Sequence, residues 1–273
     1  MNYRILHTYC LLIIRFFIKS IHTTGLEKMP KNGPVIMAGT HPNSFIDGMI
    51  ISLMFHRPVW SLSRGDAFKN DWARRFMTSI KLMPIYRMSE GRENLSKNGS
   101  TFDKVQGLLK KDQQILVFVE GLCTNQTKLL PLKKGMGRMV QSAWAEGIDT
   151  PVFPVALTYS NFDKIEKTAN IHFGDAILPS DFEEKSGGVF LHDFNEVVKE
   201  KLQGLLSWDF KPGSFFDNPI YYIGWVVNFP WYLLTRFIAK RLTKGTVHTD
   251  SVYFAFLIFT LPIYWGILIA ILT

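Results

Sequence analysis

The chain of 273 residues contains little cysteine: Cys10 and Cys123 are the two, and they stand far apart. They form no CxxC pair, which excludes a disulfide framework and a zinc knuckle. Their scarcity fits a reducing compartment. The sequence also lacks internal repeats and low-complexity segments. Its length therefore predicts one large domain, or one domain with an appendage.

Acidic residues are fewer than basic ones, 23 against 31, so the formal net charge is +8. Such a balance is typical of proteins that contact nucleic acid or an anionic membrane surface. No clustered basic motif with interleaved aromatics is present, so no nucleic-acid partner is expected. The apolar C-terminal sequence instead favours membrane lipids as partners, while the oligomeric state stays open.

The N-terminus lacks an uncharged run of the roughly 20 residues that span a bilayer, because Arg4, Arg15 and Lys19 interrupt it. No small-residue cleavage site follows, which argues against a secretory signal peptide. Residues 1–24 are predicted to form a membrane-interfacial helix whose cations snorkel toward water. The alternative is a helix packed on the protein's own core.

The C-terminus is the most apolar part of the chain, and residues 251–273 carry no charge. This stretch is long enough to span a bilayer. Tyr253, Tyr264 and Trp265 are suited to the interface, and membrane helices tolerate a kink such as Pro262 would cause. We therefore predict a transmembrane helix at 251–273.

The preceding apolar stretch, 219–239, is broken by Asn228, Pro230 and Arg236. If both stretches spanned, the basic "KRLTK" loop would face the side opposite the main domain. The positive-inside rule disfavours this for a main domain on the cytoplasmic face, where we expect it. Residues 213–273 are thus predicted to be a membrane anchor, with 219–239 interfacial or re-entrant.

Between these ends, residues 25–212 alternate short apolar runs with segments of helical period. Predicted strands cover 33–40, 58–63, 82–87, 114–121, 151–159 and 170–177. Predicted helices cover 44–56, 69–81, 133–147 and 189–206, and a further helix follows a polar lead-in within 94–111. This pattern predicts an α/β domain with a mixed, mostly parallel sheet flanked by helices. Functional residues in such folds lie where strands end.

The segment "HPNSFID" follows the first predicted strand and contains His41 and Asp47. Histidine is readily poised as a base near neutral pH, and a carboxylate can fix its tautomer. On one helix, six positions place the two side chains about 120° apart. Pro42 is disfavoured inside a helix but favoured at its start, which predicts a turn at 41–44 with Asp47 folded back to His41.

Two simpler interpretations of this segment remain. Asp47 can act only on the dipole at a helix start, and His41 can be purely structural. A metal site is not expected, because no second His or Cys stands at ligand spacing.

Other charged residues follow later predicted strands. Arg87 ends the strand "LMPIYR", and arginine is suited to bidentate phosphate binding. Glu120 and Gly121 end the very apolar "QILVFVEG", where a carboxylate is costly unless paired. Lys133 and Lys134 precede a predicted helix start, which favours anions. Together they suggest an anionic substrate beside a general base.

These segments resemble the PlsC-like glycerolipid acyltransferase family over roughly residues 25–210. The family's first block is a His and an Asp with four residues between, and here "HPNSFID" has five. "LMPIYR", "FVEGLCTN" and "VFPVAL" resemble the second, third and fourth blocks, and "PLKKGMGRMV" resembles the stretch between the last two. The order and spacing of all five match.

The resemblance implies an O-acyltransferase in which His41 is the general base and Asp47 orients it. The acceptor hydroxyl would attack the thioester of acyl-CoA or acyl carrier protein directly, with no metal or organic cofactor. Arg87, Glu120, Gly121, Lys133 and Lys134 would form the acceptor's phosphate or head-group site. Glutamate would position a cation or a hydroxyl there.

Two departures from the family pattern concern the acceptor. The dyad spacing has one extra residue, and Leu122, Cys123 and Thr124 stand where the family has Thr-Arg-Ser. Lysophosphatidic acid is the expected acceptor, with glycerol 3-phosphate or a lyso-aminolipid as alternatives. A different class, a non-catalytic membrane lipid-binding protein, would keep the apolar ends but would not need His41, Asp47 and Glu120 to converge.

Overall fold

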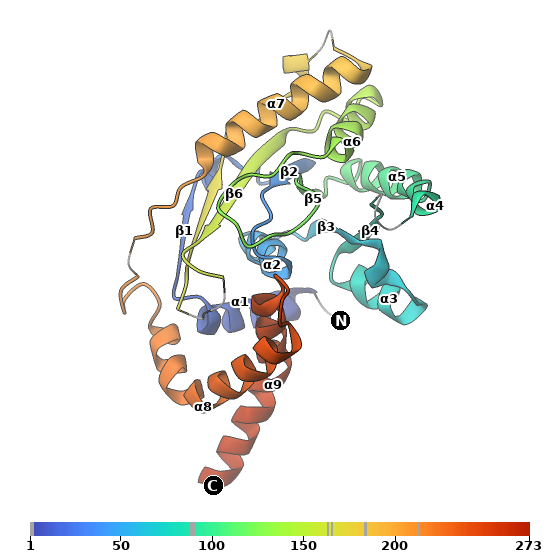
Figure 1. Cartoon of the computed structure of the whole chain (residues 1–273). Helices are drawn as coiled ribbons and strands as arrows, with labels where there is room; N and C mark the ends of the chain where they lie inside the picture. The colour runs from blue at the N-terminus through green and yellow to red at the C-terminus, as the bar shows by residue number, and fades with distance from the viewer. Residues whose placement is uncertain (1–2, 88–90, 163, 165, 183–184, 212) are drawn as a thin grey trace.

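The computed structural model describes residues 3–87, 91–162, 164, 166–182, 185–211 and 213–273 (Figure 1). Within them, the strands are β1 (Ser20–Thr24), β2 (Val35–Gly39), β3 (Val59–Arg64), β4 (Leu82–Ile85), β5 (Gln114–Phe118), β6 (Val152–Tyr159) and β7 (Thr168–Phe173). The helices are α1 (Tyr3–Phe17), α2 (Phe45–Leu53), α3 (Asp71–Ser79), α4 (Arg92–Leu95), α5 (Asn98–Leu109), α6 (Lys134–Ala145), α7 (Gly187–Leu205), α8 (Pro219–Leu242) and α9 (Thr249–Leu272). Short 3₁₀ helices are η1 (Leu26–Lys28), η2 (Gly65–Phe68) and η4 (Pro179–Phe182).

The described strands form one sheet in the order β1-β7-β6-β2-β5-β3-β4. Strands β2 to β6 all run parallel, whereas β7 is antiparallel to β6 and β1 is parallel to β7. The predicted mixed, mostly parallel sheet is confirmed. Its topology brings the carboxyl ends of five strands to one edge, where such folds carry their sites.

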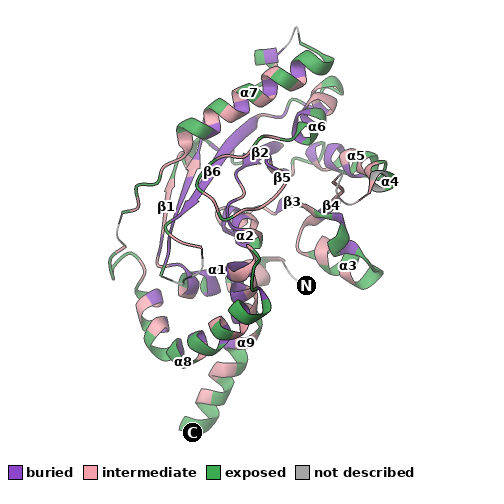
Figure 2. Ribbon diagram, in the orientation of Figure 1, coloured by how far each residue is buried: buried purple, intermediate pink, exposed green. Residues whose placement is uncertain are grey.

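Both faces of the sheet are covered, as the almost continuous apolar sequence of β2 requires. Val35 and Met37 point into a core shared with α1, α2 and α9, while Ile36 and Ala38 point into a second core with α5, α6 and α7. Figure 2 shows β2 and β6 as buried strands between these helices.

The N-terminal segment differs from the helix predicted over 1–24. Helix α1 ends at Phe17, and Ser20–Thr24 form β1, an edge strand paired with β7. The short "SIHTT" run is rich in β-branched residues and suits a sheet edge. These residues therefore belong to the sheet, which moves the start of the main domain ahead of residue 25.

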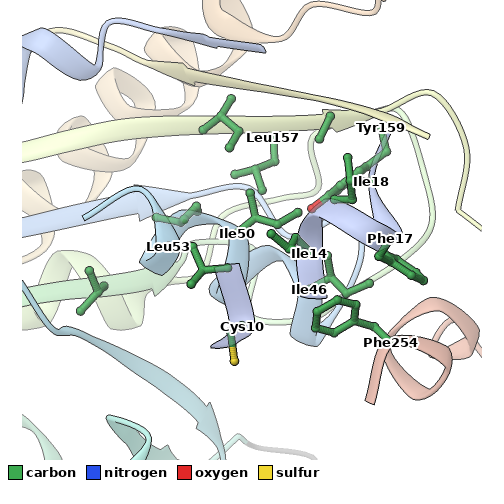
Figure 3. Close-up of a cluster of buried hydrophobic side chains, with 14 of the residues drawn as sticks. Cys10, Ile14, Phe17, Ile18, Ile46, Ile50, Leu53, Leu157, Tyr159 and Phe254 are labelled. Carbon is green, nitrogen blue, oxygen red and sulfur yellow. The ribbon is translucent and has the colours of Figure 1, made fainter. Parts of the chain in front are cut away.

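Helix α1 packs one face on the protein's own core, which was the alternative interpretation of the N-terminus. Cys10, Ile14 and Phe17 are buried against residues of α2 and α9, among them Phe254 (Figure 3). Ile5 and Leu12 lie on the outer face and are exposed. The interfacial role of that outer face stays a prediction.

The two C-terminal helices pack on each other and on α1, at the lower end of the molecule in Figure 1. Among the described residues, α9 alone is long and apolar enough to cross a membrane. Its first turns are buried against the domain, and its last turns are exposed (Figure 2). Helix α8 contains Pro230, and Asn228 in it accepts a hydrogen bond from Trp265 at 2.7 Å.

Candidate active site

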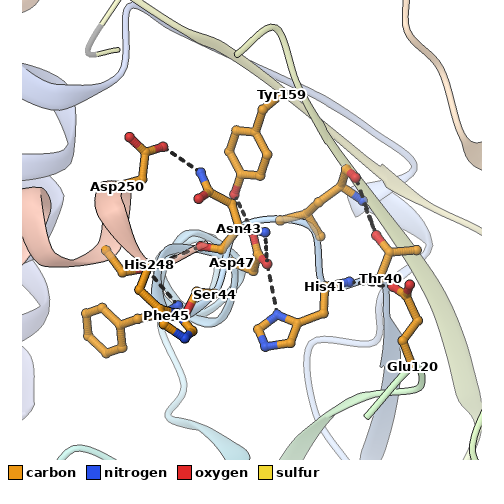
Figure 4. A network of polar contacts seen from close by, with 12 residues as sticks. Thr40, His41, Asn43, Ser44, Phe45, Asp47, Glu120, Tyr159, His248 and Asp250 are labelled. Carbon is orange, nitrogen blue, oxygen red and sulfur yellow. Dashed lines mark hydrogen bonds and ion pairs between the residues drawn. The ribbon is translucent and has the colours of Figure 1, made fainter. Parts of the chain in front are cut away.

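The turn after β2 brings His41 and Asp47 together. Pro42 disfavours a helical conformation at His41, and Ser44, with φ 57°, precedes Phe45, the first residue of α2. His41 Nδ1 lies 2.9 Å from Asp47 Oδ2 (Figure 4). The predicted turn, with Asp47 folded back to His41, is confirmed.

Asp47 is fully buried and accepts two further hydrogen bonds. The backbone N–H of Asn43 donates to Oδ2 at 2.7 Å, and the Tyr159 hydroxyl donates to Oδ1 at 2.8 Å. Burial, and then the neighbouring Asp47, raise the pKa of Tyr159 well above its ordinary value, so its hydroxyl keeps the proton that it donates. Three donors around one carboxylate offset the cost of burying its charge and fix its orientation.

The His41 ring is held in one orientation and one tautomer. Its plane stacks on Phe118, at the end of β5, with 3.9 Å between ring centres and 10° between planes. Because a carboxylate only accepts, Nδ1 carries the proton toward Asp47 and the lone pair stands on Nε2. The imidazole is 16% exposed, which leaves it access to a substrate. This arrangement can take up a proton at Nε2 and stabilise the resulting imidazolium.

Glu120 follows β5 and bridges the turn to the next loop. Its Oε1 accepts the backbone N–H of His41 at 2.8 Å, and its Oε2 accepts that of Leu130 at 3.0 Å. Burial raises the pKa of Glu120, and these two hydrogen bonds oppose the rise. Both oxygens of Glu120 are thus occupied by backbone N–H groups. Its role in positioning a cation or a hydroxyl of the acceptor stays a prediction.

Gly121 allows Lys133 to approach the same loop. Its φ of +67° is left-handed, and a β-carbon there would lie 2.8 Å from Lys133 Cγ. The backbone N–H of Lys133 also donates to Val119 O at 2.8 Å. Lys134 is exposed and lines a groove between residues 129–132 and α7, rather than lying against Gly121.

Arg87 lies at the carboxyl end of β4, on the same sheet edge as the dyad. Strand β3 separates β4 from β5, so Arg87 follows a strand two positions along the sheet from the one that Glu120 follows. The chain beyond it, residues 88–90, lies outside the described residues. Arg87, Lys133 and Lys134 thus come from different elements rather than one compact cluster, and we call these three residues the cationic rim.

Cys123 stands in the block where the family has Thr-Arg-Ser. Burial, and then the charge of Asp47, raise the pKa of this thiol to about 12. Thiolate is the nucleophilic form of cysteine, so Cys123 is unsuited to forming an acyl-enzyme at neutral pH. Within the described residues, no group of three His, Cys, Asp or Glu side chains could hold a metal ion.

Several supports of the dyad were not predicted. Tyr159 reaches Asp47 from the carboxyl end of β6, the one signal being its position as the last residue of an apolar strand. His248, Asp250 and Ser251 reach the turn from the start of α9, about 200 residues along the chain. No local pattern links those polar residues to His41.

The Acyltransferase family profile matches residues 20–158, just over half of the chain. The chain therefore belongs to the acyltransferase family. Its fold is similar to that of the 1-acyl-sn-glycerophosphate (LPA) acyltransferase PlsC from Thermotoga maritima, with a TM-score of 0.54 and 17% sequence identity over 77% of this chain and 81% of that one. No curated protein matches the chain.

Proposed function

We propose that the protein transfers a fatty acyl group from acyl-CoA or acyl carrier protein to the hydroxyl of a lysophospholipid. The acceptor would be 1-acyl-glycerol-3-phosphate and the product phosphatidic acid. The observation that carries this proposal is the His41–Asp47 pair, joined at 2.9 Å in a chain of the acyltransferase family. The protein of similar fold, PlsC from Thermotoga maritima, is a 1-acyl-sn-glycerophosphate acyltransferase, which supports the same class of acceptor here.

The proposed step needs one base and no covalent enzyme intermediate. His41 Nε2 takes the hydroxyl proton while the acceptor oxygen attacks the thioester carbonyl. The tetrahedral intermediate then expels the thiolate as the C–S bond breaks, and the imidazolium returns the proton to that sulfur. Asp47 stabilises the imidazolium in between. The protonated Cys123 thiol is consistent with direct attack.

The acceptor's phosphate would meet the cationic rim of Arg87, Lys133 and Lys134. Arginine pairs bidentately with phosphate oxygens, and lysine contributes a point charge. Lys133 lies against Gly121, the residue after Glu120, whose carboxylate accepts the backbone N–H of His41. Glu120 would orient this side of the site through the loop that it holds.

Access from a membrane favours a lyso-lipid over glycerol 3-phosphate as acceptor. The start of α9 is hydrogen-bonded to the dyad turn, and the 24 residues of α9 extend about 36 Å. Exposed apolar residues continue along α9 to Leu272 and cover the outer face of α8, as with Val226 and Phe237. If α9 crosses a bilayer, the dyad lies at its surface, which we place on the cytoplasmic side.

The test is an acceptor screen in membranes that contain the wild-type protein or His41→Ala. One labelled acyl-CoA is offered with lysophosphatidic acid, glycerol 3-phosphate or a lyso-aminolipid, and acyl-carrier-protein thioester is tested in parallel. We expect labelled phosphatidic acid from the wild type, reduced about 10²- to 10⁴-fold in the variant. Equal transfer by both proteins would refute the base assignment. A lipid-binding protein without activity would transfer nothing to any acceptor.

A further inference from the structure

The start of α9, which follows the main domain in sequence, is hydrogen-bonded to the turn between His41 and Asp47, called the dyad turn here. The Ser251 hydroxyl accepts the backbone N–H of Phe45 at 3.0 Å and lies 3.4 Å from Asn43 O, to which it donates. His248 Nδ1 lies 3.0 Å from the Ser44 hydroxyl (Figure 4). Three consecutive residues between His41 and Asp47 are therefore tied to the C-terminal helix.

Asp250 adds a buried charge to this contact. It is 1% exposed and forms an ion pair with Lys167, which is fully buried just before β7. The Asn43 side-chain amide donates to Asp250 Oδ2 at 2.7 Å. The ion pair joins the start of α9 to the chain just before β7, and the Asn43 hydrogen bond joins the same carboxylate to the dyad turn.

Asn43 relays this anchor to the dyad. Its side chain binds Asp250, its carbonyl accepts from Ser251, and its own N–H donates to the Asp47 oxygen that also faces His41. The next residue, Ser44, has φ 57° and ψ −133°, an uncommon conformation for a residue with a side chain. Such backbone persists where the surrounding structure over-determines it.

We propose that Ser251 and Asp250 are positioning residues for the acyl transfer, because they hold the turn that sets the His41–Asp47 geometry. The inference rests on the proposed function, since it concerns the same dyad. A shift of about 1 Å in a reacting group can cost about 10²-fold in rate.

The first test compares Ser251→Ala with Ser251→Thr. The alanine variant loses both hydrogen bonds to the turn, whereas threonine keeps the hydroxyl. We expect Ser251→Ala to lower kcat between about 10-fold and 10²-fold, with KM for acceptor and donor nearly unchanged, and Ser251→Thr to restore most of kcat. A change confined to kcat and rescued by a hydroxyl distinguishes positioning from a general loss of stability.

A matched control lies in the same helix. The Thr260 hydroxyl accepts from Trp231 Nε1 at 2.8 Å and so joins α9 to α8, far along the helix from the turn. Thr260→Ala should lower the thermal midpoint as much as Ser251→Ala does but leave kcat close to the wild-type value. Wild-type kcat in Ser251→Ala, or an equal loss of kcat in both variants, would overturn the proposal.

The second test addresses Asp250 without leaving an unpaired buried charge. The double variant Lys167→Met/Asp250→Leu replaces both members of the ion pair by apolar residues, an exchange that is often neutral for stability. Asn43 then loses its side-chain partner while the fold is retained. We expect kcat to fall about 10-fold and the thermal midpoint to fall as well, because the buried Asn43 amide loses its acceptor. A folded double variant with wild-type kcat would overturn the role of Asp250.

A readout that needs no activity separates this inference from the proposed function. The Nδ1 proton of His41, hydrogen-bonded to Asp47, can be followed by NMR in detergent micelles with ¹⁵N-histidine. It should be displaced or lost in Ser251→Ala and unchanged in Thr260→Ala. If the wild type acylates no acceptor, the proposed function fails while this comparison still decides the positioning. If the wild type is active and the proton signal is identical in both variants, only the positioning fails.

Discussion

The dyad turn and the cationic rim lie on the same edge of the sheet but are built differently. In the turn, Asp47 accepts three hydrogen bonds and the His41 ring stacks on Phe118. In the rim, Lys133 and Lys134 are exposed, and Arg87 comes from a strand two positions along the sheet from β5. Under the proposed function, the base and its partner are held by several contacts, while the acceptor would be recognised by long side chains. Changes in the turn should affect kcat, and changes in the rim should affect KM.

The largest effect is expected from His41→Ala. Removal of the base should lower kcat about 10²- to 10⁴-fold with little change in KM for the acceptor. Steady-state kinetics with purified protein in detergent micelles measures both constants. The thermal midpoint should also fall, because the fully buried Asp47 loses one of its three donors. If the variant keeps its kcat and loses affinity for the acceptor instead, His41 would act in acceptor binding, as proposed for the cationic rim, and not as the base.

Asp47→Asn should come next, with a loss of kcat of about 10²-fold or more at the same KM. An asparagine amide can donate to Nδ1 and hold the wrong tautomer, so the lone pair would no longer stand on Nε2. Tyr159→Phe is the matched comparison, because it removes one donor to Asp47 and leaves the carboxylate in place. Its loss should be about 10-fold, and a larger loss than in Asp47→Asn would contradict the assignment.

Glu120→Gln tests a residue that lies between the two regions. The N–H groups of His41 and Leu130 face different oxygens of Glu120, so in glutamine one of them would face the new amide NH₂ group. We expect a loss of stability of about 1–3 kcal/mol together with a lower kcat. Denaturant unfolding and kinetics on the same samples measure this. A rise in acceptor KM alone, at unchanged stability, would assign Glu120 to the head-group site that the family resemblance implies.

Arg87→Ala probes the rim and should raise KM for an anionic acceptor about 10-fold, with kcat nearly unchanged. Arg87→Lys should recover part of this, because charge remains but bidentate geometry is lost. Lys110→Ala is the control, since Lys110 is exposed and paired with Glu146 on α6's far end. An equal effect in the control would show that overall charge, rather than a site, attracts the acceptor.

The sequence predicted the dyad turn better than the residues that hold it, because the turn depends on neighbouring residues whereas its supports come from distant parts of the chain. Pro42 acts on its direct neighbours, so the return of Asp47 to His41 follows from local geometry. Tyr159 and Asp250 reach the turn only after the sheet has formed and α9 has packed on α2. The strand at 20–24 was missed for a related reason, because it follows a helix directly and is paired only with β7.

The strand ends that carry Arg87 and Glu120 were predicted, but their partners were not. Parallel topology follows from the alternation of strands and helices, so these residues were expected on one edge. The strand order, which places β3 between β4 and β5, is not encoded in any local pattern. The sequence therefore indicates which residues share an edge, and packing decides which of them touch.

The smallest predicted effect concerns His248, the most exposed support of the turn. Burial, and then the charges of Arg64 and His41, lower the pKa of His248 below its ordinary value of about 6.5. The unfolded chain then binds this proton more readily than the folded one, so His248 removes stability as pH falls through about 6.5. In His248→Gln the thermal midpoint should fall less between pH 7.5 and 5.5 than in the wild type. The difference should be under about 2 °C, because the ring is partly solvated. Other titrating groups are common to both proteins, so the difference between their two pH profiles isolates His248. A profile identical to the wild type would mean that the pKa of His248 is the same in the folded and the unfolded chain.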